Sequence, residues 1–135
     1  MSALDAVAKA ILDSVDDGLG FAIVDLESGL LLGSAHASDV VSPIVLETVA
    51  AAAVDLFRGR TVAAVERTIA QARGTSASHL IKEAQLTTDR TYLFALVLPN
   101  KPSAIAVLIT GRRTNLGVGW AAVRQAVPSV EPLIP

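Results

Sequence analysis

Apolar residues recur at helical spacing near the start of the chain. A spacing of three and four residues places such side chains on one face of a helix. Ser2 can cap this helix, and Asp5, three residues further on, completes a capping box in which the shorter Asp stands in place of Glu. Asp16-Asp17-Gly18 ends the helix, because Gly18 is free to take positive φ. The predicted stripe consists of Leu4, Val7, Ala8, Ile11, Leu12 and Val15.

Two short apolar runs follow and predict a β-hairpin. Phe21–Leu26 and Leu30–Ser34 bracket Glu27-Ser28-Gly29, whose composition suits a tight turn. Both runs are nearly continuous in apolar residues. We therefore expect both faces of both strands to be covered.

The middle of the chain predicts a long helix that is buried on more than one side. Ser42 caps it, and Pro43 occupies its first position. Apolar residues surround it, which is typical of a helix that contacts two surfaces. One face holds Val45, Val49, Ala52, Ala53 and Leu56, whereas Ile44, Ala51, Val54 and Phe57 lie on other faces. Arg58-Gly59-Arg60 breaks this helix, and Thr61–Ala72 predicts a further one.

Three strands are predicted for the second half of the chain. The mixed pattern of Ser78–Thr87 indicates a half-exposed strand. Thr91–Leu98 and Ala104–Thr110 are strongly apolar, and turn residues separate them.

A last helix is expected between a polar cap and a proline. Thr114 or Asn115 supplies the cap, Pro128 stops the helix, and residues 128–135 form a tail. The apolar face of this helix consists of Leu116, Trp120, Val123 and Val127.

The element order predicts a single α+β domain over residues 1–135. Strand runs interrupted by helices indicate an α/β/α sandwich with a central five-stranded, mostly antiparallel sheet. The first and last helices are expected on one face of the sheet, and the long middle helix on the other. Residues 61–73 form an extra helical segment in this scheme.

Composition narrows the function classes. The chain has 135 residues, is 52% hydrophobic and carries a net charge of −2, which gives no pull toward nucleic acid or an anionic membrane. The absence of cysteine excludes disulfides, thiol catalysis and zinc–thiolate sites. Its apolar runs are far shorter than the ~20 residues of a membrane helix. We expect a cytoplasmic protein that neither binds nucleic acid nor inserts into a membrane.

Catalytic and cofactor motifs are lacking. Residues 117–122 fit the spacing G-x-G-x-x-A, but a dinucleotide site also needs a second strand, for which the chain leaves no room. His36 in a polar loop and His79 at a strand entrance are the two histidines of the chain, and in such positions they are typical of surface residues rather than metal ligands. No phosphate-binding loop with a lysine occurs. We expect no cofactor, no metal, no catalytic residue and no enzymatic activity.

Arginine outnumbers lysine and gathers in two stretches. Arginine suits interfaces, because its planar guanidinium forms bidentate contacts. A merely solvated face is an equally good interpretation. The candidate partner-binding residues are Arg58, Arg60, Arg112 and Arg113.

Three local patterns together resemble the roadblock family, the dynein light chain and longin-like regulators of small GTPases. They are the hairpin from Gly20 to Leu30, the small-residue middle helix, and the strand 106–110 followed by Asn115-Leu116-Gly117. The resemblance spans roughly residues 3–127. Each pattern is weak alone, and the resemblance rests on the order and spacing of all three. The stretch Arg58–Arg73 departs from the family, because it is longer than the usual link.

The resemblance implies a roadblock- or profilin-like fold and a dimer formed by the middle helices and third strands. It also implies a non-catalytic role: binding a Ras-like small GTPase, supporting its hydrolysis in some bacterial gliding-polarity systems, or serving as an assembly platform. The apolar middle helix and the alternating third strand favour a homodimer on their own account. The candidate dimer residues are Val45, Val49, Ala52, Ala53, Leu56, Leu80, Ala84 and Leu86.

Two other functions stay open at this stage. One is a structural adaptor in a larger complex without a GTPase. The other is a small-molecule sensor of profilin- or PAS-like shape, although the sequence lacks a polar pocket signature.

Overall fold

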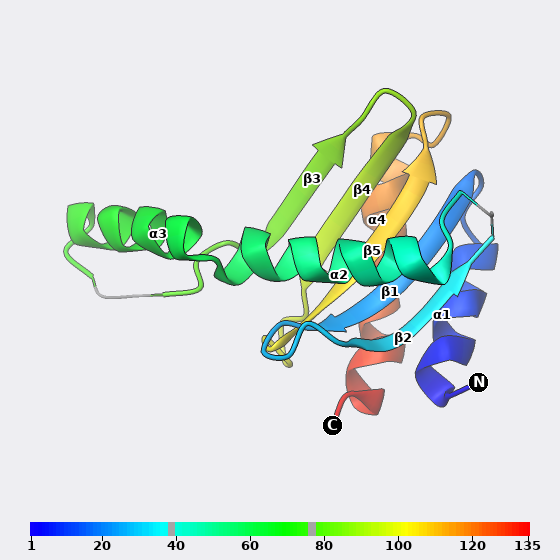
Figure 1. Cartoon of the computed structure of the whole chain (residues 1–135), viewed down its shortest axis with the longest axis horizontal. Helices are drawn as coiled ribbons and strands as arrows, with labels where there is room; N and C mark the ends of the chain where they lie inside the picture. The colour runs from blue at the N-terminus through cyan, green and yellow to red at the C-terminus, as the bar shows by residue number, and fades with distance from the viewer. Residues whose placement is uncertain (38–39, 76–77) are drawn as a thin grey trace.

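The structure is a computed structural model that describes residues 1–37, 40–75 and 78–135. Its elements, shown in Figure 1, are α1 (Ala3–Asp13), β1 (Gly18–Asp25), β2 (Leu31–His36), α2 (Pro43–Arg58), α3 (Arg60–Ala72), β3 (Glu83–Thr87), β4 (Thr91–Val97), β5 (Ala104–Gly111), α4 (Leu116–Val130) and the short 3-10 helix η1 (Glu131–Leu133). Within these described ranges, no helix combines the length and apolarity needed to cross a membrane.

The strands form one five-stranded sheet in the order β2-β1-β5-β4-β3. Each neighbouring pair is antiparallel. Helices α1 and α4 cover one face and α2 crosses the other (Figure 1), which confirms the predicted α+β sandwich. Strand β5 lies at the centre, and all of its residues are buried.

The core has two layers, one on each face of the sheet. Phe21, Phe94 and Leu108 belong to the layer beneath α1 and α4. Val24 and Ile105 belong to the layer beneath α2. Alternate residues of the same strand thus serve opposite layers, which explains why β1, β4 and β5 read as continuous apolar runs.

The predicted capping box of α1 is present and also ties the helix to the sheet. Ser2 Oγ accepts from the Asp5 N–H at 3.1 Å, and Asp5 Oδ2 accepts from the Ser2 N–H at 3.0 Å. The second oxygen, Asp5 Oδ1, accepts from the Ser34 N–H of β2 at 2.9 Å. One carboxylate therefore satisfies donors of both a helix start and a sheet edge.

The end of α1 and the hairpin differ in detail from the prediction. Positive φ falls on Asp17, at 62°, rather than on Gly18. Strand β2 is only partly buried, because it lies at the edge of the sheet, so the expectation that both hairpin strands are covered is wrong for β2.

Strand β3 is half as long as predicted. It begins at Glu83 rather than Ser78. The backbone N–H groups of Leu80 and Ile81 instead donate to the carboxylate of Glu66 in α3. A backbone donor engaged in this way is not available to a strand ladder.

The chain after Pro128 is not a tail. Pro128 lies inside α4, which continues to Val130 before η1 begins. Ile134 is buried, and the Glu131 carboxylate accepts from the Asn100 backbone N–H at 2.6 Å and from its side-chain amide at 3.0 Å. The predicted face of α4 is confirmed at Val123, which is buried, and at Trp120 and Val127, which pack against the same core layer, whereas Leu116 is exposed. The other buried residues of α4 are Gly119, Ala126 and Val130.

Gly119 owes its place in the glycine-rich helix start to packing. A Cβ added there would lie 2.4 Å from the ring of Phe94. The missing side chain lets α4 approach β4 closely, and Phe94 also contacts Trp120 edge-on at 5.3 Å between ring centroids.

We expect Gly119→Ala to destabilise the fold despite the higher helix propensity of alanine. Overpacking against the buried Phe94 ring should outweigh that gain and lower the free energy of unfolding by about 1–2 kcal/mol. Urea unfolding followed by circular dichroism measures this. The exposed Val118→Ala serves as the control and should change stability by less than about 0.5 kcal/mol. A Gly119→Ala protein more stable than the parent would contradict the packing role.

Asp5 should make stability depend on pH. Hydrogen bonds from the Ser2 and Ser34 backbone N–H groups hold the pKa of Asp5 below its ordinary value of 3.8. The unfolded chain therefore binds the proton more tightly, so the stabilisation is complete above the unfolded pKa and is lost as pH falls through the folded pKa. We expect Asp5→Asn to cost about 1 kcal/mol at pH 7.

The difference between parent and Asp5→Asn should shrink as the pH of urea titrations falls from 7 toward 2. Asp89→Asn, which removes the same charge from an exposed turn, is the matched control. A difference that stays constant across this pH range would refute the assignment.

Candidate protein-binding surface

Helix α2 has an inner side against the sheet and an apolar outer flank. Leu46, Ala50, Ala53 and Phe57 are its buried residues. Of the apolar face predicted for this helix, only Ala53 belongs to the side that packs against the sheet. Val45, Val49 and Leu56 are half-buried on the flank, and Ala52 is exposed.

Strand β3 forms an edge of the sheet, and its two sides are chemically different. On one side, Ala84 packs against the core layer beneath α2, and Leu86 lines an apolar groove between β3 and α2. Gln85 accepts from the Trp120 indole N–H of α4 at 2.9 Å, and Glu83 pairs with Arg124 at 3.0 Å. These two contacts fix the strand so that Leu86, 48% exposed, faces the side of α2.

An apolar groove of about 410 Å³ lies between α2 and β3. We call it the α2–β3 groove. Among the residues that the structure describes, Asp55 is the one charged residue in its lining. This lining consists of Val49, Ala52, Ala53, Asp55, Leu56, Phe57, Val62, Leu86, Leu93, Ala95 and Val107. An apolar groove next to an unpaired strand edge is a surface suited to another polypeptide.

The structure brings most of the candidate dimer residues together. Val49, Ala52, Ala53, Leu56 and Leu86 all line the α2–β3 groove. This grouping joins two elements that are distant in sequence.

Three candidate dimer residues lie outside the groove lining. Val45 belongs to the first turn of α2, and Ala84 is half-buried in β3. Leu80 precedes β3, where its N–H donates to Glu66.

Helix α3 is the extra segment that the sequence predicts, and the structure shows its position. It follows α2 after Gly59 and extends past β3, away from the rest of the sheet (Figure 1). Glu66 is only 3% exposed, because its carboxylate accepts the N–H groups of Leu80 and Ile81. Sequence reasoning missed this role, since a single glutamate in a helix carries no signal of a distant backbone partner.

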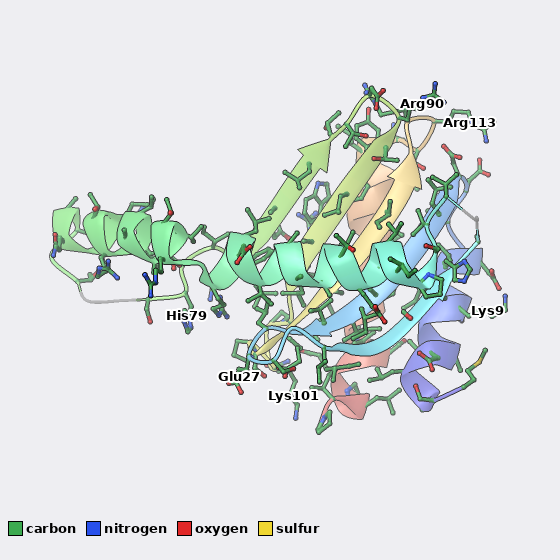
Figure 2. All side chains as sticks on the ribbon, viewed as in Figure 1. Lys9, Glu27, His79, Arg90, Lys101 and Arg113 are labelled. Carbon is green, nitrogen blue, oxygen red and sulfur yellow. The ribbon has the colours of Figure 1, made fainter. Side chains whose placement is uncertain are left out.

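The four candidate arginines form two separate groups. Arg58 Nη2 donates to the Pro102 carbonyl at 2.9 Å, before β5 begins. Arg112 lies after β5, where it donates to the Thr88 carbonyl at 2.8 Å and covers the Tyr92 ring at 4.8 Å. The length of β5 separates the two groups. Figure 2 labels Lys101 near the beginning of β5 and Arg113 just after its end, and the two residues lie at opposite ends of the sheet.

The remaining two arginines differ in their surroundings. Arg113 pairs with Asp17 at 3.3 Å, but its side chain is 88% exposed. Arg60 is exposed at the start of α3, in the group of Arg58. The four residues therefore do not make one patch.

Buried polar groups are used for structure. Among residues 1–37, 40–75 and 78–135, no cluster of three or more potential metal ligands occurs, and no buried side-chain polar atom lacks a hydrogen bond. Glu66 and Glu131 cap backbone groups, and Thr114 Oγ1 donates to the Asp16 carbonyl at 2.9 Å.

Comparison with known proteins identifies the fold. No protein-family model matches the sequence, and no curated protein matches it. Among solved structures, the Roadblock/LC7 domain from Streptomyces avermitilis matches with a TM-score of 0.71 at 17% identity, covering 98% of each chain. MglB from Myxococcus xanthus matches with a TM-score of 0.70 at 16% identity, covering 98% of this chain and 95% of its own.

A structure described as MglB with a tetrameric arrangement also matches. Its TM-score is 0.70 at 18% identity, and the match covers 95% of this chain and 85% of that one. These identities are low, but the matches extend over nearly the whole domain. The chain has the fold of roadblock domains.

Proposed function

We propose that the chain is a non-catalytic, homodimeric regulator or scaffold of the roadblock family that binds a Ras-like small GTPase and modulates its GTP hydrolysis. The observation that carries the proposal is the α2–β3 groove beside the free β3 edge. The roadblock fold supports it, because the sequence resemblance to that family implies dimers and GTPase partners. The self-assembled MglB relative agrees with this proposal.

The dimer uses a twofold arrangement of the two β3 edges. Antiparallel pairing of the edges continues the sheet from one copy into the other. The outer flank of each α2 then covers the α2–β3 groove of the other copy. This contact removes the apolar lining of the groove from water. Small residues such as Ala52 permit close approach of the two helices.

Leu86→Arg should convert the dimer into a folded monomer. Leu86 is 48% exposed, so the single subunit tolerates the charge, but two unpaired arginines would meet at the paired edge. Light scattering on a sizing column should then give a mass near 14.0 kDa instead of twice that value. Ala53 is less suitable, because it is buried against the sheet and a charge there would unfold the subunit.

Leu116→Arg is the matched control, since Leu116 is 41% exposed at the start of α4, which covers the opposite face. It should stay dimeric. A parent protein that is monomeric across micromolar concentrations would refute the proposed dimer.

Binding of a GTPase should depend on the nucleotide of the partner. We expect the immobilised dimer to recover a P-loop GTPase from its own cell extract with a non-hydrolysable GTP analogue, and far less of it with GDP. The chain itself should bind no GTP in calorimetry, because it has no phosphate-binding loop. A set of large proteins recovered equally with either nucleotide would instead identify a structural adaptor.

A further inference from the structure

We propose that α3 is an intersubunit arm, which packs through Val65 and Ile69 on a second copy of this chain beyond the paired β3 edges. The inference rests on the proposed dimer and adds a contact that pairing of α2 and β3 does not include. Four observations support it: the direction of α3, its anchoring, its exposed apolar residues and the short β3 edge.

The direction of α3 places it over the neighbouring subunit. Gly59 ends α2 in an extended conformation, and a Cβ there would lie 2.4 Å from the Asp55 carbonyl oxygen, so the break requires glycine. Beyond this break, α3 extends past β3 (Figure 1). Its 13 residues span ~20 Å, about the width of four strands. A second sheet joined at the β3 edge would occupy this region.

The arm is held in place by its own contacts. The buried Glu66 carboxylate accepts hydrogen bonds from the N–H groups of Leu80 and Ile81, which connects α3 to the segment just before β3. At the far end, the Ala70 carbonyl accepts from the Thr75 N–H at 2.8 Å. The arm is thus anchored to the segment that leads into the strand proposed to pair with the second copy.

The apolar surface continues from the groove onto the arm. Val62 lines the α2–β3 groove, and Val65 and Ile69 follow it at helical spacing. Val65 is 50% exposed and Ile69 is 41% exposed. A partner that fills the groove would therefore meet further apolar surface along α3.

The short β3 edge leaves the dimer in need of additional contact. A stable interface buries ~1,600 Å² in total. Strand β3 supplies only five residues of edge, half the length expected from the sequence. A twofold dimer has two arms, one from each copy, and they add contact at both ends of the interface. This geometry favours a second copy of the chain as the occupant.

Single cysteines test the arm directly, because the chain has none of its own. Ile69→Cys should react with a thiol reagent about tenfold more slowly when about 90% of the chains are dimeric, since only free subunits expose it. Ala64→Cys is the matched control: Ala64 is exposed on another side of α3 and should react at the same rate at all concentrations.

A charge at the same position gives a second measurement. Ile69→Asp should raise the dimer Kd about tenfold or more, whereas Ala64→Asp should leave it unchanged. Circular dichroism verifies that both variants fold. A dimer in which Ile69→Cys stays fully reactive and Ile69→Asp has no effect would overturn the arm and leave the proposed dimer intact. A monomer at every concentration would overturn both.

Discussion

The rest of the structure depends on a difference in width between the five-stranded sheet and the helices that cover it. Five strands are ~20–24 Å wide, whereas a helix with its side chains is ~10–12 Å wide. Helices α1 and α4 together cover one face, but α2 crosses the other alone. The uncovered part of that face is the α2–β3 groove, where Leu86 and Leu93 line apolar space. Within the described residues, three helices on the two apolar faces of the sheet leave this surface open, and it is the surface that the proposed dimer would cover.

Local patterns predicted most of the fold because local interactions produce it. The capping box of Ser2 and Asp5, the cap by Asn115 and the glycine turn of the hairpin all act within a few residues. The failures have distant causes. Strand β3 begins late because Glu66, far earlier in the chain, binds Leu80. Periodicity carries no information about such contacts.

The candidate site was predictable to the extent that its residues share an element. Val49, Ala52 and Leu56 follow from an apolar girdle on one helix, and Leu86 follows from alternation in one strand. The sequence does not reveal which side of α2 packs against the sheet, because both sides are apolar. In the structure, the sheet-facing side is the one that carries the larger Leu46 and Phe57 side chains. The arginines separate for a similar reason. Proximity in sequence to an element says little about which end of the sheet that element reaches.

The buried charges of the described residues have a structural role. Glu66 and Glu131 are the acidic groups buried within the described ranges, and both bind backbone N–H groups. A buried carboxylate that accepts such hydrogen bonds satisfies backbone donors that would otherwise lack a partner. Both carboxylates fix an irregular segment next to a strand: Glu66 secures the approach to β3, and Glu131 secures the turn before β5. These two buried carboxylates thus stabilise the geometry of the sheet and of its β3 edge, beside which the apolar α2–β3 groove lies.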